Sequence, residues 1–277
     1  MDSESKITAR YLRILSYSVL AFTLAFLINN VLTVWVDWPG VKKIFSHYEL
    51  FGFKQKALQG SELNYGYLQI GIYLICIAGV ILYVFKTYSQ TLEHDSEILS
   101  KFSAYLVRSS FWAVFLVGVA DFIISFMVVE RLWEAIFSPE VKAFMVKAPE
   151  RITFIHFPII LGSFIIGYFT KSVGFIWLAV LVVLSEFVIV LSRFIFSYEQ
   201  AFQGDLVRFW YAALYLFASA YALIHEGHVR VDVLYSSFSE RKKAWTNSIG
   251  SALLGVPLCL IVIFYGLNGK ASIINGP

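Results

Sequence analysis

The sequence predicts an all-α membrane protein, with helices that cross the bilayer several times. Of its 277 residues, 58% are hydrophobic and only 15% are charged, and the mean hydropathy is +0.71. A soluble domain of this length could not bury so much apolar surface. The apolar runs are about 20 residues long, enough for a helix to cross a hydrocarbon core of roughly 30 Å. We therefore expect a polytopic bundle of helices and not a barrel of strands.

Three apolar runs in the first half of the chain predict three spans, at residues 14–36, 63–85 and 109–129. Trp35 and Trp38 follow the first run, as in the aromatic belt at a membrane surface. That first run is too long for the apolar part of a cleavable signal peptide. The polar segments after the runs are predicted to be loops outside the bilayer: residues 37–61, 86–108 and 130–151.

Asp121 lies inside the third predicted span. A carboxylate is costly at membrane depth, so we expect it to face other helices or a wet cavity, with either a structural or a functional role. His156 and Pro158 lie in the next apolar run, where a packed histidine and a proline kink are the simplest expectation. Pro257 is expected to kink the last apolar run in the same way.

Two further apolar runs, residues 152–169 and 172–192, are separated only by Thr170 and Lys171. One straight helix through both would be roughly 61 Å long, about twice the hydrocarbon thickness. The sequence therefore predicts two spans, the fourth and the fifth, and a reversal of the chain between them.

Charged residues accompany the later spans. Glu186 and Arg193 lie two turns apart on one face of the fifth predicted span, where they could pair with each other or with a partner helix. Asp205 and Arg208, one turn apart, lie at the start of the next apolar run. The sixth and seventh spans are predicted at residues 206–224 and 245–266.

The loop between the last two spans carries His225, Glu226, His228, Arg230 and Asp232 in close succession. A metal site is the first alternative, but HEGH does not place two histidines on one helical face as HExxH does, and no cysteine lies nearby. Haem ligation would need paired histidines within the spans. The sequence therefore predicts no metal site and no cofactor.

Apolar residues in and after this loop fall at i, i+3, i+4 and i+7, which makes one stripe on a helix. A short amphipathic helix in the membrane interface is therefore predicted. Ser237, with Glu240 three residues later, resembles a capping box for the helix that follows. The stripe consists of Val231, Leu234, Tyr235 and Phe238.

The residues around this loop resemble a known family. Between Arg208 and Trp245 the chain carries Tyr211, the segment AYAL, the string GHVRVDVLY and a Ser-Glu-Arg step before a Trp-led helix. Arg193 and Phe194, at the end of the preceding span, also fit the pattern. This combination is similar to the DctQ-type small membrane subunit of tripartite ATP-independent periplasmic (TRAP) transporters.

The resemblance covers residues 172–277 and implies two domains. Residues 1–171 would be an N-terminal membrane extension with four predicted spans, and residues 172–277 the small-subunit module with three. The minimal unit of the family has four membrane helices. The apolar runs predict seven spans in all, and the resemblance implies an eighth beyond Pro277.

The family implies a non-enzymatic small permease subunit that crosses the inner membrane of a bacterium several times. Its expected partners are a large membrane permease subunit, a periplasmic solute-binding protein and membrane lipid, with no nucleic acid. The small subunit would scaffold the large one during cation-coupled uptake of an organic acid or similar solute. Contacts between subunits or structural roles are implied for Glu186, Arg193, Arg208, His228, Arg230, Asp232 and Tyr235.

Two other functions stay open from the residues alone. A membrane enzyme or redox subunit could use Asp121, Glu186 or the cluster from His225 to His228, and would then hold metal, haem or quinone. A self-sufficient carrier would move solute without a partner, although the sequence lacks the internal repeats and interrupted helices expected of such carriers.

Overall fold

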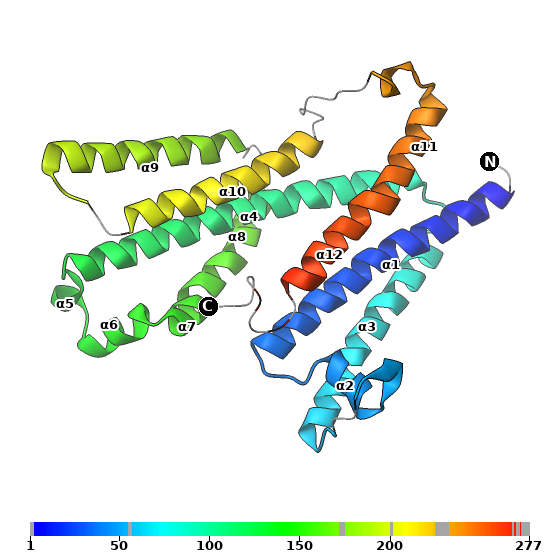
Figure 1. Ribbon diagram of the computed structural model, residues 1–277, viewed down its shortest axis with the longest axis horizontal. Coiled ribbons are helices and arrows are strands. Elements are labelled where there is room, and N and C mark those ends of the chain that lie inside the picture. The colour runs from blue at the N-terminus through cyan, green and yellow to red at the C-terminus, as the bar shows by residue number, and fades with distance from the viewer. Residues whose placement is uncertain are drawn as a thin grey trace. The chain divides into compact units, whose positions relative to one another are not determined.

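The computed structural model describes residues 3–54, 57–171, 175–199, 202–224, 233–267, 269 and 272, and its regular structure there is entirely helical (Figure 1). The chain divides into two compact units, Met1–Asp95 with Asp232–Pro277, and Ser96–Val231. The helices are α1 (Ser3–Val34), α2 (Val41–His47), α3 (Ser61–Lys86), α4 (Leu92–Val129), α5 (Trp133–Ile136), α6 (Pro139–Val146), α7 (Ala148–Arg151), α8 (Phe157–Phe169), α9 (Phe175–Phe196), α10 (Gln203–Ile224), α11 (Glu240–Gly250) and α12 (Val256–Gly266).

Six helical segments within the described ranges are long and apolar enough to cross a membrane. The predicted all-helical membrane architecture is therefore confirmed. The predicted sixth span, residues 206–224, forms α10, but α10 is not one of these six segments, so the count of seven or eight spans stays a prediction. The six are Ile7–Val34, Ser61–Lys86, Leu92–Val129, Pro149–Phe169, Trp177–Phe196 and Glu240–Gly266.

The predicted loops contain more helix than the sequence analysis allowed. The segment 86–108 was expected to be a linker, but α4 begins at Leu92 and continues for 38 residues. Leu, Glu and Lys favour helix here, and the Thr91 hydroxyl oxygen accepts a hydrogen bond from the backbone N–H of His94 at 3.2 Å, as a cap does. Helix α2 lies in the segment 37–61, and α5, α6 and α7 lie in 130–151. The polarity of these segments marks exposure to water, not a lack of helix.

In the first unit, α1 and α3 pack against each other in opposite directions. The ring of Phe22 lies 5.3 Å from that of Tyr73, and nearer the end of α1 the Gln69 amide nitrogen donates to the Thr33 hydroxyl at 3.1 Å. Gln69 is fully buried, and its amide oxygen accepts a hydrogen bond from the backbone N–H of Gly40 at 2.8 Å. This glutamine fixes the turn after α1 against α3 and satisfies a buried backbone donor.

In the second unit, α4 lies close to both α8 and α10. A Cβ added at Gly118 would meet the Trp210 indole nitrogen at 2.6 Å, and one at Gly167 would meet the Ser109 hydroxyl at 2.4 Å. The Trp210 N–H donates to the carbonyl of Val114 at 3.4 Å. Glycine therefore permits these two crossings of α4, because any larger residue would need the neighbouring helix to move.

Both predicted proline kinks coincide with five-residue π-helical turns. The turn Ile152–His156 precedes Pro158, and the turn Ser251–Gly255 precedes Pro257. A proline lacks the N–H of a regular helix and its ring clashes with the carbonyl four residues earlier, so the wider π turn relieves the clash. The fourth and fifth apolar runs form two separate helices, α8 and α9, as predicted, and part of the connection in which the reversal was expected, residues 172–174, lies outside the described residues.

The predicted amphipathic helix before α11 is wrong in its described part. Residues 233–238 form a turn and a single 3₁₀ turn, Tyr235–Ser237, and the N-cap of α11 is Ser239 with no side-chain cap bond. The proposed capping box fails because the Ser237 hydroxyl donates instead to the carbonyl of Leu234 at 2.7 Å. A local bond of this kind competes with helix formation. Val231, the first residue of the predicted stripe, lies outside the described residues.

Candidate functional site

Glu186 and Arg193 lie on α9, within the candidate span Trp177–Phe196, and both side chains are exposed. No ion pair joins them in the described part of the chain, so the first of the two predicted pairings does not form. The surrounding face of α9 is apolar: Val183, Phe187 and Val190 are each about half exposed or more. Glu186 is thus a carboxylate on a face that would otherwise contact lipid.

Arg208 pairs with Asp205 across the first turn of α10, with a guanidinium nitrogen 3.4 Å from a carboxylate oxygen. The two side chains are 84% and 61% exposed, so water screens the pair and it contributes little to stability. Both side chains remain accessible to another protein.

Tyr235 is half buried and joins the turn before α11 to that helix. The Asn247 amide donates to its hydroxyl at 2.8 Å, and the Lys243 ammonium lies 6.0 Å from the centre of its ring. These contacts give Tyr235 a structural position within the first unit. The other predicted site residues of this loop, His228, Arg230 and Asp232, lie outside the described residues.

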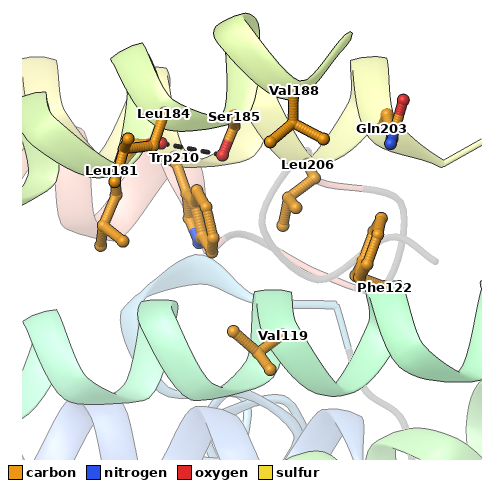
Figure 2. Close-up of a pocket in the computed structure, with 9 residues that line it drawn as sticks. All are labelled: Val119, Phe122, Leu181, Leu184, Ser185, Val188, Gln203, Leu206 and Trp210. Atoms are coloured by element: carbon orange, nitrogen blue, oxygen red, sulfur yellow. Dashed lines mark hydrogen bonds between the residues drawn. The ribbon is translucent and has the colours of Figure 1, made fainter. Parts of the chain in front are cut away.

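An apolar cavity of about 270 Å³ lies among α4, α9 and α10 (Figure 2). Its walls include Phe122, Leu181 and Trp210, and the Ser185 hydroxyl is turned back onto the carbonyl of Leu181 at 2.8 Å. Gln203, at the start of α10, lines the cavity and is 8% exposed, and among the described residues its side-chain oxygen has no hydrogen-bond partner. Sequence reasoning missed this cavity because its walls come from helices far apart in the chain.

Asp121 faces other helices, as predicted, and its partners come from the segment before α8. One carboxylate oxygen lies 2.9 Å from His156 Nε2 and 3.4 Å from Arg151 Nε. The carboxylate is 18% exposed at the side chain. The arrangement offsets the cost of a carboxylate at membrane depth and ties α4 to α8, which favours the structural expectation for Asp121 and His156.

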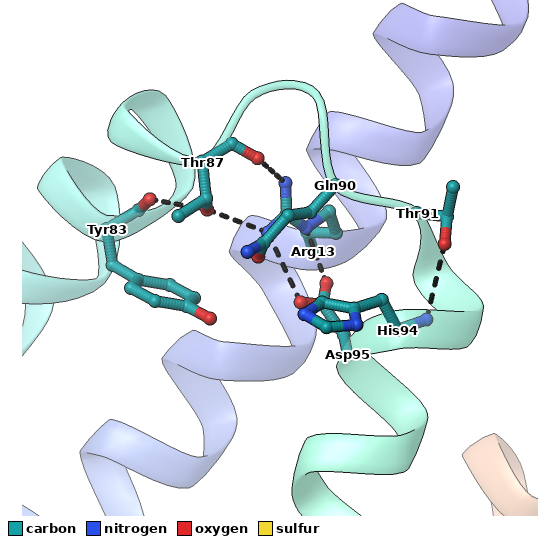
Figure 3. A network of polar contacts seen from close by, with 7 residues as sticks. All are labelled: Arg13, Tyr83, Thr87, Gln90, Thr91, His94 and Asp95. Carbon is teal, nitrogen blue, oxygen red and sulfur yellow. Dashed lines mark hydrogen bonds and ion pairs between the residues drawn. The ribbon is translucent and has the colours of Figure 1, made fainter.

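A second buried ion pair, between Arg13 and Asp95, was not predicted (Figure 3). Arg13 Nε lies 2.5 Å from one oxygen of Asp95, and the same guanidinium donates to the carbonyl of Thr87 at 2.7 Å and to its hydroxyl at 2.9 Å. Gln90 accepts a further hydrogen bond at 3.4 Å. A charged pair 82 residues apart leaves no periodic signal in the sequence. The only local hint was a cation at the edge of the first apolar run.

Outside the spans, two neighbouring charges shift the pKa of exposed groups. The Lys142 ammonium donates a hydrogen bond to Glu134 at 2.7 Å, which lowers the pKa of that carboxyl. The Tyr198 hydroxyl donates to the Glu130 carboxylate, and this hydrogen bond raises the pKa of the phenol. The second contact links the end of α4 to the end of α9. Both groups are at the surface, and neither belongs to a reactive cluster.

The described residues hold no group of three or more His, Cys, Asp or Glu side chains that could bind a metal ion. The two carboxylates named for a possible enzyme, Asp121 and Glu186, differ in setting: Asp121 is paired with His156, whereas Glu186 is exposed and has no ion pair with any residue that the structure describes.

Comparison with known proteins gives one match. Residues 179–276 match the family described as tripartite ATP-independent periplasmic transporters, DctQ component. No curated protein and no solved structure matches the chain. The match begins within α9 and includes α10, α11 and α12, as well as the loop that carries the GHVRVDVLY string.

The matched family is a transporter component and is not enzymatic, which removes the enzyme alternative. It also sets the location, because a periplasmic transporter system works from the inner membrane, and the six candidate spans make this chain a multi-pass protein of that membrane. Residues 179–276 are therefore similar to the DctQ component of the TRAP transporters, and the residues before them lie outside this match.

Proposed function

We propose that this chain is the small permease subunit of a TRAP-type secondary transporter and that it scaffolds the large membrane subunit. The large subunit would take up an organic acid or a similar solute with a cation, after a periplasmic binding protein has delivered the solute. The match of residues 179–276 to the DctQ component supports this function most strongly. A scaffold needs exposed residues that can contact a partner. Glu186 and Arg193 on α9 and Arg208 on α10 are exposed in this way.

We further propose that residues 172–277 form the small-subunit module and residues 1–171 an extension with four spans. In this scheme α10 is a seventh span. Its support is a helix of 22 residues that packs along α9, together with the aromatic side chains at its start. The start of the family match at residue 179 agrees with a boundary near residue 172.

The exposed face of α9 is our proposed contact with the large subunit. An unpaired carboxylate facing lipid is expensive, so Glu186 is expected to meet a hydrogen-bond donor or a cation on another helix. Arg193, two turns later and near the end of the span, would meet an acceptor in the same partner. Two charges at fixed spacing would select one docking register, because a shifted helix would leave both unpaired.

The loop residues His228, Arg230 and Asp232 are proposed to act with Tyr235 and Arg208 in the same assembly. Their support is the sequence string that resembles the family. Tyr235 holds the turn before α11 through Asn247, so it would position the loop and not contact the partner directly.

Co-purification tests the proposed docking face. A tagged large subunit should retain the wild-type chain, and the double variant Glu186→Gln with Arg193→Gln should be retained about tenfold less or worse. The variant Arg230→Ala with Asp232→Ala should weaken retention as well. A matched control is Glu97→Gln, which removes a carboxylate from an exposed pair on α4.

The control should be retained like the wild type. Equal retention of the wild type and the α9 double variant would contradict the assigned face. Failure of the wild-type chain itself to co-purify would contradict the scaffold function. The experiment therefore separates the two claims.

A further inference from the structure

A cavity of about 550 Å³ lies at one end of the first unit, outside the part of the chain that matches the family. Its walls come from the start of α1, the turn after α3 and the start of α4. They include Arg10, Arg13, Gln90, Thr91 and Glu93. Most of the lining surface is apolar, but its side chains include charges of both signs, unlike those around the cavity among α4, α9 and α10.

Arg13, on the wall of the cavity, is already held by hydrogen bonds within the protein. Arg13 is 3% exposed and uses its guanidinium on Asp95, Thr87 and Gln90 (Figure 3). It therefore has little capacity left for a ligand. Because the Gln90 oxygen accepts from Arg13, the amide NH₂ of Gln90 is the group left to donate elsewhere. The Thr91 oxygen likewise accepts from the N–H of His94, which leaves its hydroxyl hydrogen free to donate.

Two opposite charges on the walls of this cavity are not paired with each other. The Arg10 guanidinium lies 5.7 Å from the centre of the Phe85 ring, and Glu93 is exposed in the first turn of α4. Within the described ranges neither of them forms an ion pair. A ligand that carries both a negative and a positive group would satisfy both walls.

The position of the cavity along the candidate spans indicates the source of such a ligand. Two candidate spans have their ends beside it: one begins at Ile7 and another ends at Lys86. Tyr88 also lines the cavity, and tyrosine is typical of the membrane surface. The cavity therefore lies at the level of the lipid headgroups.

We propose that this cavity binds the headgroup of a zwitterionic phospholipid with a primary ammonium, of the phosphatidylethanolamine type. Arg10 binds the phosphate, assisted by the donors of Gln90 and Thr91, and Glu93 binds the ammonium. A lipid with phosphate as its only charge would gain the contact with Arg10. It would gain no contact with Glu93, whose carboxylate would repel it. The site thus distinguishes ethanolamine lipids from purely anionic ones, and it does not depend on the scaffold function.

Lipid retention tests the proposal. The full chain is equilibrated with equal amounts of phosphatidylethanolamine and phosphatidylglycerol, purified in mild detergent, and its bound lipid is quantified by mass spectrometry. One charge-assisted hydrogen bond corresponds to about tenfold in affinity. The wild type should retain the ethanolamine lipid about tenfold over the glycerol lipid. Glu93→Gln should remove this preference, and Arg10→Gln should reduce retention of both lipids about tenfold.

Matched controls are Glu97→Gln and Lys101→Gln, which change an exposed pair on α4 that does not line the cavity. Both should behave like the wild type. Soluble glycerophosphoethanolamine at equal concentration should not displace the lipid, because it lacks the acyl chains that hold the headgroup at this depth. Retention without preference in the wild type, or an unchanged preference in Glu93→Gln, would overturn the proposal. Displacement by the soluble headgroup would overturn the choice of a membrane lipid as the ligand.

Discussion

At the scale of single residues, the charges of this protein fall into buried pairs and exposed ones. Arg13 and Asp95 have side chains that are 2% and 7% exposed, whereas Lys101 and Glu97 are 79% and 59% exposed. Burial removes water from the first pair, so each partner depends on the other for solvation. The second pair keeps its hydration whether or not it forms.

Replacing one partner of the buried pair should therefore be costly. Arg13→Gln or Asp95→Asn is expected to reduce the free energy of unfolding by about 3–5 kcal/mol, because an unpaired charge would stay buried. Thermal or denaturant unfolding in detergent micelles measures the loss. The double variant Arg13→Met with Asp95→Leu should lose less than either single variant.

Lys101→Gln is the matched control, and a change of less than about 1 kcal/mol is expected for an exposed pair. Losses as small for Arg13→Gln as for this control would show that the buried pair does not anchor α4 to α1.

The sequence predicted that a charged side chain needs a partner only where the neighbouring residues showed its surroundings. Asp121 stands inside an apolar run, so its need for a partner was clear from the sequence, although Arg151 and His156 were identified only by the fold. Arg13 and Asp95 gave no such signal, because Arg13 directly precedes the first predicted span and Asp95 lies in the segment 86–108, which was expected to be a loop. Glu186 and Arg193 were correctly placed on one span, but helical spacing could not decide whether they pair with each other.

At the scale of elements, α4 is the helix on which the second unit is assembled. Gly118 lies against Trp210, which is 5% exposed, and the indole stacks at 5.9 Å on Phe115. Leu206 is also within 3.0 Å of a Cβ built at Gly118. The start of α10, within the family match, is thus packed on a helix that precedes the matched residues.

Filling this contact should separate the two helices. Gly118→Val places side-chain atoms where Trp210 lies, and an overpacked contact of this kind costs about 1–3 kcal/mol. We expect lower unfolding stability and a change in tryptophan fluorescence as the indole becomes more exposed. Gly79→Ala in α3 is the matched control, since no atom lies within 4 Å of a Cβ at Gly79. The packing is refuted if Gly118→Val has the same stability and fluorescence as the control.

Apolar length predicted the elements better than polarity did. Six of the seven predicted apolar runs coincide with the six candidate spans of the described residues, and Pro158 and Pro257 marked the irregular turns of two of them. The extra turns of α4 were missed because a helix in water needs no apolar run. The interfacial helix before α11 failed for the opposite reason: its stripe had the right period, but Ser237 bonds locally and interrupts the helix.

At the scale of the whole molecule, the family match covers the C-terminal part of the chain and leaves the extension without an assigned role. The string around the last loop was specific enough to indicate this family from the sequence. The division at residues 171 and 172 and the count of seven spans stay predictions, since they concern the arrangement in a membrane. One contact connects the residues before the match to the matched part: the packing of α4 on α10.

The central claim is that this chain scaffolds a transporter whose transport step takes place in the large subunit. Solute uptake by proteoliposomes tests it most directly, with a periplasmic binding protein outside, an inward cation gradient and a panel of organic acids. We predict cation-dependent uptake when both membrane subunits are present, and background uptake with either one alone. Uptake of the same rate without this chain, or uptake by this chain alone, would contradict the account.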